Sequence, residues 1–230
     1  MSRNPFPRNS LGRKNLMAIT GLFLCLFLVI HLAGNLQLLL PPEQARLQYN
    51  LYSEVLSHNI LIKVISYALY ASILAHAIYA LLLTQKARTA RGQQAYVYDR
   101  RRQTAPWYRR FMGVLGALLL VFIVIHMKDF WFQYKFTSVA FDSAGRKDLY
   151  AIVEQAYTQG WYVALYVFSM LVLGFHLWHG FFSAFQTMGL YHPKYGRWMK
   201  RAGMLYTLVI TTGFIVIPIY MYFIKNPILS

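Results

Sequence analysis

The sequence predicts an all-α integral membrane protein, built as a bundle of five transmembrane helices. Hydrophobic residues make up 57% of its 230 residues and charged residues only 13%, about half the charged share of a soluble domain. Five apolar runs are long enough to cross about 30 Å of hydrocarbon as helices. They are residues 16–40, 60–83, 108–132, 161–185 and 202–224. Because no internal repeat or low-complexity tract interrupts the chain, residues 1–230 are expected to form one transmembrane domain.

The ends of these runs carry ordinary helix signals. Pro41 and Pro42 stop the first span, and Pro218 interrupts the last one near its end. The basic N-terminal tail precedes an apolar run that is too long for a signal peptide, so we expect a retained first helix. The single cysteine, Cys25, lies within that helix, which excludes a disulfide framework within the chain.

Basic residues orient the bundle. Of the 23 Lys and Arg, 16 fall in the N-terminal tail, in a predicted loop at 84–107 with its flank to 110, or in a predicted loop at 186–201. All acidic residues except Asp99 lie on the opposite side. The positive-inside rule therefore places the N-terminus in the cytoplasm and the C-terminus outside. Since the cations lie between apolar runs, we expect contact with membrane lipid or an acidic partner, and no nucleic acid.

One histidine lies deep within each of the first four spans. At 1.5 Å per residue, His31 and His126 lie about 22 and 27 Å from the inner ends of their helices. The same arithmetic places His76 and His176 about 10 and 14 Å from the inner ends. The four histidines therefore form an outer pair and an inner pair, separated by about 10–15 Å along the membrane normal.

Two histidines from different helices at one depth can ligate both faces of a haem, and such six-coordinate iron suits electron transfer. The sequence thus predicts a haem-binding bundle with two haem b groups. His179, three residues after His176, is the alternative ligand on that helix. Interhelical hydrogen bonding is the other explanation for intramembrane histidines. A zinc or copper site is disfavoured, because ligands in two layers do not converge on one tetrahedral centre.

Two motifs carry a family resemblance. The stretch "HLAGN" in the first span and the stretch "HLWHG" in the fourth resemble the H-L-x-x-N and H-x-x-x-G patterns of one family of cytochrome b subunits. These are the membrane anchors of succinate dehydrogenase and quinol:fumarate reductase, of the single-chain, five-helix, di-haem type. The second motif favours His176 over His179, since the ligand stands four residues before the glycine. Gly180 would leave room for a flat macrocycle beside the backbone.

The resemblance implies a subunit of a respiratory enzyme in the bacterial cytoplasmic membrane. A flavoprotein subunit and an iron–sulfur subunit would bind its cytoplasmic face, and the chain itself would bind no succinate. Electrons would pass to the inner haem, then to the outer haem, then to a quinone. Di-haem members of the family are generally associated with menaquinone.

Further site residues follow from the same comparison. The candidates for the haem propionates are Arg13, Lys14, Arg109 and Arg110, although positive-inside sorting explains these cations equally well. Glu54 stands where fumarate reductases carry a carboxylate implicated in quinol proton exchange; the alternative is a solvated loop acid. Those enzymes also carry a glutamate on the fourth helix, which the stretch "VLGFH" lacks here. Asp129 either pairs with Lys128 or exchanges protons.

Two other functions remain open at this point. The first is a haem-free anchor that tethers soluble subunits and shapes a quinone pocket, with histidines that only form hydrogen bonds. The second is the cytochrome b subunit of another oxidoreductase, of the formate dehydrogenase or hydrogenase type. A transporter is disfavoured, because the spans lack acidic groups and paired broken-helix signals.

Overall fold

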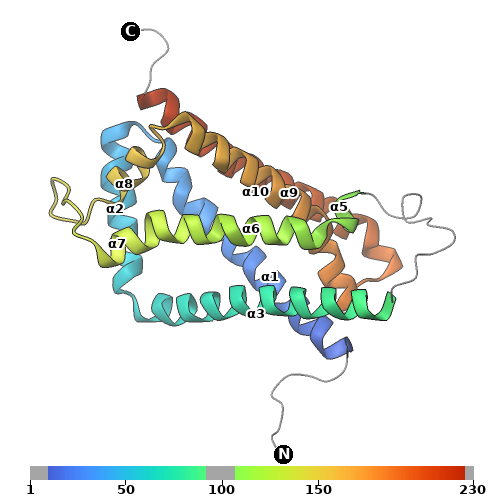
Figure 1. The fold of residues 1–230 in the computed structure, drawn as a ribbon. Coiled ribbons are helices and arrows are strands. Elements are labelled where there is room, and N and C mark those ends of the chain that lie inside the picture. The colour runs from blue at the N-terminus through green and yellow to red at the C-terminus, as the bar shows by residue number, and fades with distance from the viewer. Residues whose placement is uncertain (1–9, 92–106, 226–230) are drawn as a thin grey trace, which may run out of the picture.

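The computed structural model describes residues 10–91 and 107–225, and its long elements are all helices (Figure 1). Five helical stretches are long and apolar enough to cross a membrane, which confirms the predicted all-α class and the number of spans. They are α1 (Ser10–Asn35) with η1 (Leu36–Leu39), α3 (Ile60–Arg91), α6 (Met112–His126) continued by η2 (Met127–Phe132) and α7 (Gln133–Phe136), α9 (Gly160–Thr187) and α10 (Pro193–Lys225). The chain is therefore a multi-pass membrane protein.

Three shorter helices lie at the ends of the long ones: α2 (Pro42–His58), α5 (Trp107–Arg110) and α8 (Leu149–Ala156). Helices α2, α7 and α8 gather at one end of the bundle, on the left in Figure 1. We call this the outer end, after the predicted orientation. At the opposite, inner end α1 begins, α3 ends and α9 turns into α10.

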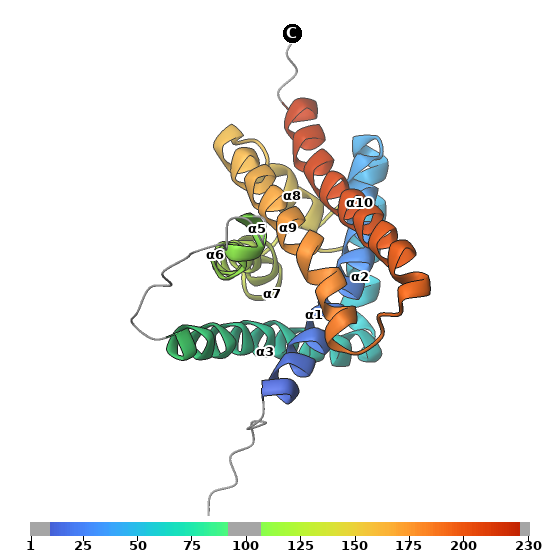
Figure 2. The same cartoon turned by 90° about the vertical axis from the view of Figure 1, so that its right-hand side faces the viewer.

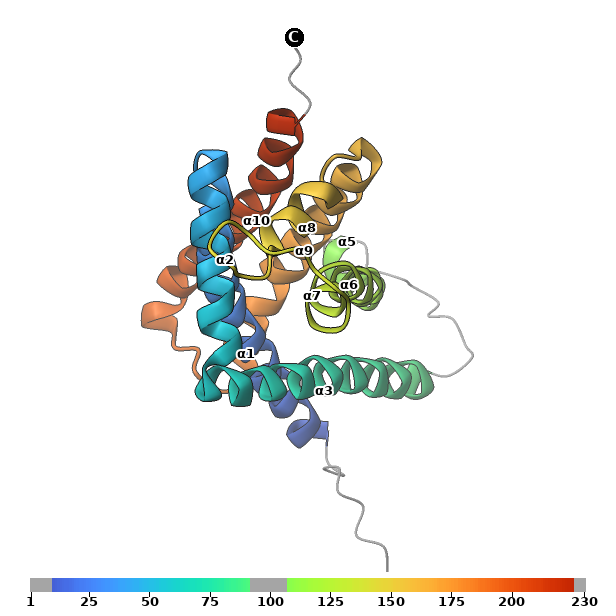
Figure 3. The same ribbon diagram turned by 90° about the vertical axis from the view of Figure 1, so that its left-hand side faces the viewer.

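Helix α9 is the centre of the bundle. It packs against α10, α1 and α6, whereas α3 packs chiefly on α1 and more lightly on α6. Figures 2 and 3 show α3 on the opposite side of the bundle from α10. Most buried side chains lie where α1, α9 and α10 meet. Histidines on α1, α3, α6 and α9 can therefore approach one another. Helix α10 packs against α9 and α1 on the side of the bundle opposite α3.

The boundaries of the predicted inner loops are wrong. Helix α9 continues to Thr187 and α10 begins at Pro193, so most of the expected loop at 186–201 is the first part of α10. Helix α3 likewise continues to Arg91, into the expected loop at 84–107, of which the rest lies mostly outside the described residues. The basic residues of 194–201 thus belong to a helix.

The turn between α9 and α10 is short because a glycine reverses the chain. Gly189 has a φ of 72°, a left-handed conformation that costs glycine little. The Leu190 N–H donates to the Phe185 carbonyl at 3.0 Å, and the Gly189 N–H donates to the Gln186 carbonyl at 3.1 Å. These two bonds are a Schellman motif, which stops a helix within one residue of the glycine.

The segment after the first span, expected as an outer loop, is the 17-residue helix α2. Pro42 occupies its first position, where a missing N–H costs nothing. Its buried face carries Tyr49 and Asn50. The segment was missed because it is too polar to be a span, and only spans stand out by hydropathy.

A polar cluster, the outer latch, joins α2 to α8; its members are Arg46, Asn50 and Asp148. Asn50 and Asp148 are fully buried. Arg46 donates its Nε–H to the Asp148 carboxylate at 2.7 Å, and Asn50 donates to it at 3.0 Å. Asp148 also caps α8 by accepting the Ala151 N–H at 3.0 Å. Burial alone would raise the pKa of Asp148, but the bonds from Arg46 and Asn50 bring it below its usual value.

Candidate cofactor site

The outer histidine pair is formed by α1 and α6. The ring centroids of His31 and His126 are 5.8 Å apart and the ring planes are nearly perpendicular, at 85°. Both side chains are half-buried. Two residues that are 95 positions apart in sequence therefore meet at one level of the bundle, as their calculated depths predicted.

Aromatic rings surround this outer pair. Phe27 stacks on His31 at 5.1 Å, and Phe214 of α10 lies 5.5 Å from the same ring. Phe122 and Phe130 flank His126 at 5.8 and 5.2 Å. The pair thus lies in an apolar setting, where an unliganded polar ring is costly.

The inner pair is formed by α3 and α9. The ring centroids of His76 and His176 are 6.3 Å apart, at an interplanar angle of 68°. Glycines of the other two helices face this pair. A Cβ at Gly21 of α1 would lie 3.2 Å from His76 Cε1, and one at Gly116 of α6 would lie 3.7 Å from His176 Cε1. The two glycines allow the neighbouring backbones to approach the rings closely.

A threonine hydroxyl lies beside Nδ1 of His76. The Thr20 hydroxyl lies 3.3 Å from His76 Nδ1 and 2.9 Å from the Leu16 carbonyl. A hydroxyl has one proton to donate, and the carbonyl can only accept it. With its proton on the Leu16 carbonyl, Thr20 can accept from His76 Nδ1–H, a tautomer that would leave the lone pair of Nε2 free to bind a metal.

The other three ligand candidates differ in what lies beside Nδ1. His126 Nδ1 lies 3.2 Å from the Tyr166 hydroxyl. The Asn35 amide nitrogen lies 3.4 Å from His31 Nδ1, which is too long to fix a tautomer. His176 Nδ1 is buried and has no hydrogen-bond partner within the described part of the chain.

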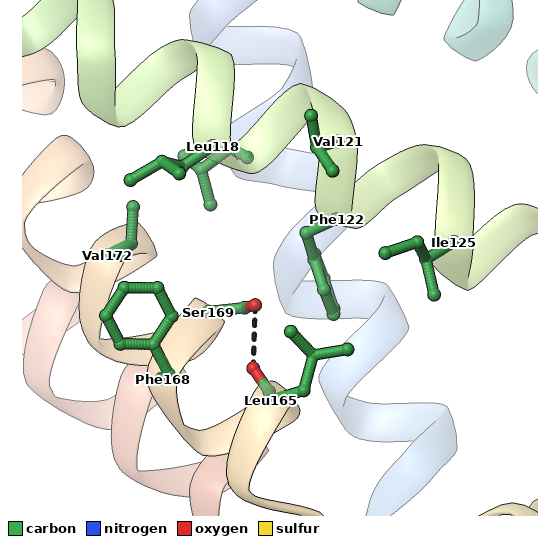
Figure 4. Close-up of a pocket in the computed structure, with 9 residues that line it drawn as sticks. Leu118, Val121, Phe122, Ile125, Leu165, Phe168, Ser169 and Val172 are labelled. Atoms are coloured by element: carbon green, nitrogen blue, oxygen red, sulfur yellow. Dashed lines mark hydrogen bonds between the residues drawn. The ribbon is translucent and has the colours of Figure 1, made fainter. Parts of the chain in front are cut away.

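The space between the two levels is apolar at the contact of α6 and α9. A small pocket of about 90 Å³ lies there and is shown in Figure 4. Its lining includes Phe122, Ile125, Leu165 and Val172. The one hydroxyl in it, that of Ser169, is already bonded to the Leu165 carbonyl at 2.8 Å. No ionisable side chain lines this pocket.

The distance within each pair fits two imidazoles that share one metal ion. At about 2.0 Å per metal–nitrogen bond, with each ring centre about 1.1 Å behind its nitrogen, two axial imidazoles have centres about 6 Å apart. The observed 5.8 and 6.3 Å agree with this value, which also lies within the range of ordinary ring contacts, such as that of Phe122 with His126 at 5.8 Å. In residues 10–91 and 107–225, no group of three His, Cys, Asp or Glu side chains is placed to hold a metal ion. Two donors per centre suit an iron whose other four ligands belong to a porphyrin.

A Cβ added at Gly180, four residues after His176, would meet no atom within 4 Å. The role inferred for this glycine from the H-x-x-x-G pattern stays a prediction. The ring that meets His76 is that of His176, and His179 as an alternative ligand stays a prediction.

Glu54 is not a free loop acid. It lies on α2, and its carboxylate forms an ion pair with Arg146 Nε at 3.3 Å, while the side chain remains 43% exposed. The pair connects α2 to the segment before α8. A role for Glu54 in proton exchange with a quinone remains a prediction.

The cations suggested for haem propionates all lie at the inner end, on α1 and α5. Lys14 and Arg110 are exposed and Arg13 is half-buried, whereas the side chain of Arg109 lies outside the described residues. Their role toward haem propionates stays a prediction.

Sequence reasoning missed several side chains around the histidines: Thr20, Gly21, Gly116, Tyr162 and Tyr166. Thr20 precedes His31 by 11 residues, about three helical turns, so helical spacing alone indicated a shared face for Thr20. The two tyrosines had no such signal, because the contact of Tyr166 with His126 and that of Tyr162 with Asp129 depend on how α6 and α9 pack.

Comparison of the chain with known protein families, with curated proteins and with solved structures finds no match.

Proposed function

We propose that the chain is the di-haem cytochrome b membrane anchor of a succinate:quinone oxidoreductase in a bacterial cytoplasmic membrane. One observation carries the proposal. Four histidines from four different helices meet as two separate ring pairs, each with the spacing of two axial imidazoles. The sequence motifs that resemble this family contain two of these histidines, one from each pair.

The residues of the chain have distinct roles in this proposal. His31 and His126 would hold the outer haem, and His76 and His176 the inner one. Bound haem supplies a one-electron carrier at each level. Thr20 orients His76, and the phenylalanines around the outer pair exclude water. The apolar contact between α6 and α9 separates the two levels without an intervening charge.

The inner end suits the docking of a flavoprotein subunit and an iron–sulfur subunit. The first turns of α10 present Trp198, which is 68% exposed, with the Arg201 guanidinium 5.4 Å from the centre of its ring. Cations and exposed aromatic side chains at a membrane surface favour anionic lipid and acidic protein surfaces. This end is also the nearer one to the inner histidine pair.

A quinone, of the menaquinone class by the family resemblance, would react at the outer end. A shallow hollow of about 230 Å³ is lined there by Met127, Lys128, Trp131 and Phe132, directly after His126 in the chain. Apolar aromatic walls with one cation suit an amphiphilic ring. Glu54, on α2 at the same end, is the candidate for proton exchange.

The experiment is to purify the tagged chain from its native membranes, identify the co-purifying subunits, and add succinate while recording the visible spectrum. The proposal predicts a flavoprotein and an iron–sulfur subunit, with haem bands that succinate reduces. A colourless complex with the same two subunits would indicate a haem-free anchor. A catalytic subunit of the formate dehydrogenase or hydrogenase type would instead assign the chain to another oxidoreductase.

A further inference from the structure

A chain of polar groups leads from His126 to the outer end of the bundle. His126 Nδ1 lies 3.2 Å from the Tyr166 hydroxyl, which lies 3.2 Å from the Tyr162 hydroxyl. Tyr162 donates to Asp129 Oδ2 at 2.8 Å. Tyr162 and Tyr166 are both buried in α9, one helical turn apart. Asp129 lies in η2 with its side chain 20% exposed.

The π-helical turn η2 places Asp129 at the end of this chain. It begins directly after His126 and runs from Met127 to Phe132. Single π-helical turns are rare and occur mostly at functional sites, because they change the direction of the residues that follow. Here the turn brings Asp129 to the hydroxyl of Tyr162 on the neighbouring helix.

Each tyrosine hydroxyl has one proton to donate, and this fixes the direction of the hydrogen bonds between His126 and Asp129. Tyr162 donates to Oδ2 of Asp129, and the other carboxylate oxygen lies 3.5 Å from Lys128 Nζ, so both carboxylate oxygens act as acceptors. Tyr162 must therefore use its single proton on Asp129, and its oxygen accepts from Tyr166. Tyr166 has then spent its own proton, and its oxygen accepts from His126 Nδ1–H. The lone pair of Nε2 is left free.

Within residues 10–91 and 107–225, the hydrogen bonds of His31, His76 and His176 reach no carboxylate, although Asn35 beside His31 accepts from the Tyr49 hydroxyl at 3.2 Å. A single threonine faces His76, and the contact at His31 Nδ1 is long, at 3.4 Å. His176 Nδ1 has no partner in the described ranges of the chain. The surroundings of Nδ1 therefore differ between His126 and the other three ligand candidates.

We propose that Asp129, Tyr162 and Tyr166 are positioning residues that fix the tautomer and orientation of His126 as an axial ligand, and thereby set the properties of the outer haem separately from those of the inner one. The inference rests on the proposed function. A ligand imidazole that donates its second N–H to an acceptor is held in orientation and becomes more basic. A more basic ligand favours the ferric state, so this chain lowers the midpoint potential of the outer haem.

The test is a potentiometric titration of both haems in the purified complex, with low-spin electron paramagnetic resonance as the signature of ligand orientation. Three variants interrupt the series of hydrogen bonds from His126 to Asp129: Tyr166→Phe, Tyr162→Phe and Asp129→Asn. The matched control is Tyr157→Phe. Tyr157 is equally buried and its ring centre is 5.3 Å from that of Tyr166, but it is not one of the links between His126 and Asp129.

The expected result for Tyr166→Phe is a rise in the midpoint potential of one haem and a changed low-spin signal for that haem, with the other haem unaltered. Tyr162→Phe and Asp129→Asn should shift the same haem in the same direction by less, because the bond from His126 to Tyr166 survives. Tyr157→Phe should match the wild type. Loss of one haem in Tyr166→Phe, with both retained in Tyr157→Phe, would also support the proposal.

Two unchanged potentials in Tyr166→Phe, with both haems bound, would overturn this inference and leave the proposed function standing. Equal shifts in Tyr157→Phe would overturn it as well, since a packing change would then explain the effect. A wild-type complex without haem would overturn both proposals.

Discussion

Replacement of Asp148 by alanine is expected to release α2 from α8 at the outer end. Asp148 is fully buried and accepts hydrogen bonds from Arg46, from Asn50 and from the Ala151 N–H. Figure 3 looks onto this end, where α2 and α8 lie side by side. Alanine removes the charge partner of Arg46, one of the two carboxylate acceptors of the buried Asn50 amide and the cap of α8 in one step, whereas the bond from Asn50 to Asp142 Oδ2 at 3.2 Å remains.

The structure sets the size of the effect. Removal of one partner from a buried ion pair costs about 3–5 kcal/mol. The Arg46 side chain is 45% exposed and water can solvate it afterwards, so we expect the lower limit, about 3 kcal/mol. Asp148→Asn keeps an acceptor for Asn50 and loses one charged bond, at a cost of about 1.5–3 kcal/mol.

Amide hydrogen exchange of α2 in detergent measures this directly, because exchange through local opening reports the local free energy. A loss of about 3 kcal/mol speeds exchange by about 100-fold. The matched control is Glu43→Gln, an exposed acid in the first turn of α2, which loses at most about 1 kcal/mol of helix-dipole interaction. If α2 exchanges no faster in Asp148→Ala than in Glu43→Gln, the latch does not hold this helix.

Acid should open the same latch. The pKa of Asp148 is lowered on folding. Its contribution to the stability of the folded state is therefore complete above the ordinary pKa of about 3.9 and is lost as the pH falls through the lowered pKa. Amide exchange of α2, corrected for the intrinsic rate, should rise below about pH 4 in the wild type and stay flat in Asp148→Asn. At the inner pair, Gly21→Ala should reduce haem content more than Gly116→Ala, since its Cβ would lie 3.2 Å rather than 3.7 Å from a ligand ring; equal pyridine haemochrome values for the two variants would contradict this. Gly180→Val should lower haem content, because no atom of the described chain lies within 4 Å of an added Cβ and the side chain would enter space left for the macrocycle; full haem content would show that the macrocycle does not use that space.

The number of spans and the pairing of the histidines were predictable because both depend on local geometry. An apolar run of about 20 residues has one stable form in hydrocarbon, and a fixed rise per residue converts position into depth. His31 with His126 and His76 with His176 follow from that arithmetic alone, without knowledge of which helices are neighbours.

The features that were not predictable depend on packing between distant segments. Helix α2 is stabilised by the outer latch, whose members Arg46 and Asp148 are about 100 residues apart. The chain from His126 to Asp129 requires a π-helical turn and two tyrosines from another helix. The early start of α10 was foreseeable from Gly189 and Pro193, which are ordinary stop and start signals.

The central claim is that each histidine pair holds one haem. The most direct measurement is a reduced-minus-oxidised visible spectrum of the detergent-purified complex, with a pyridine haemochrome count per chain. The account predicts two b-type haems per chain, with loss of one in His31→Ala and of the other in His76→Ala. A complex with no haem would contradict it and would leave the four histidines as hydrogen-bonding residues of a passive membrane anchor.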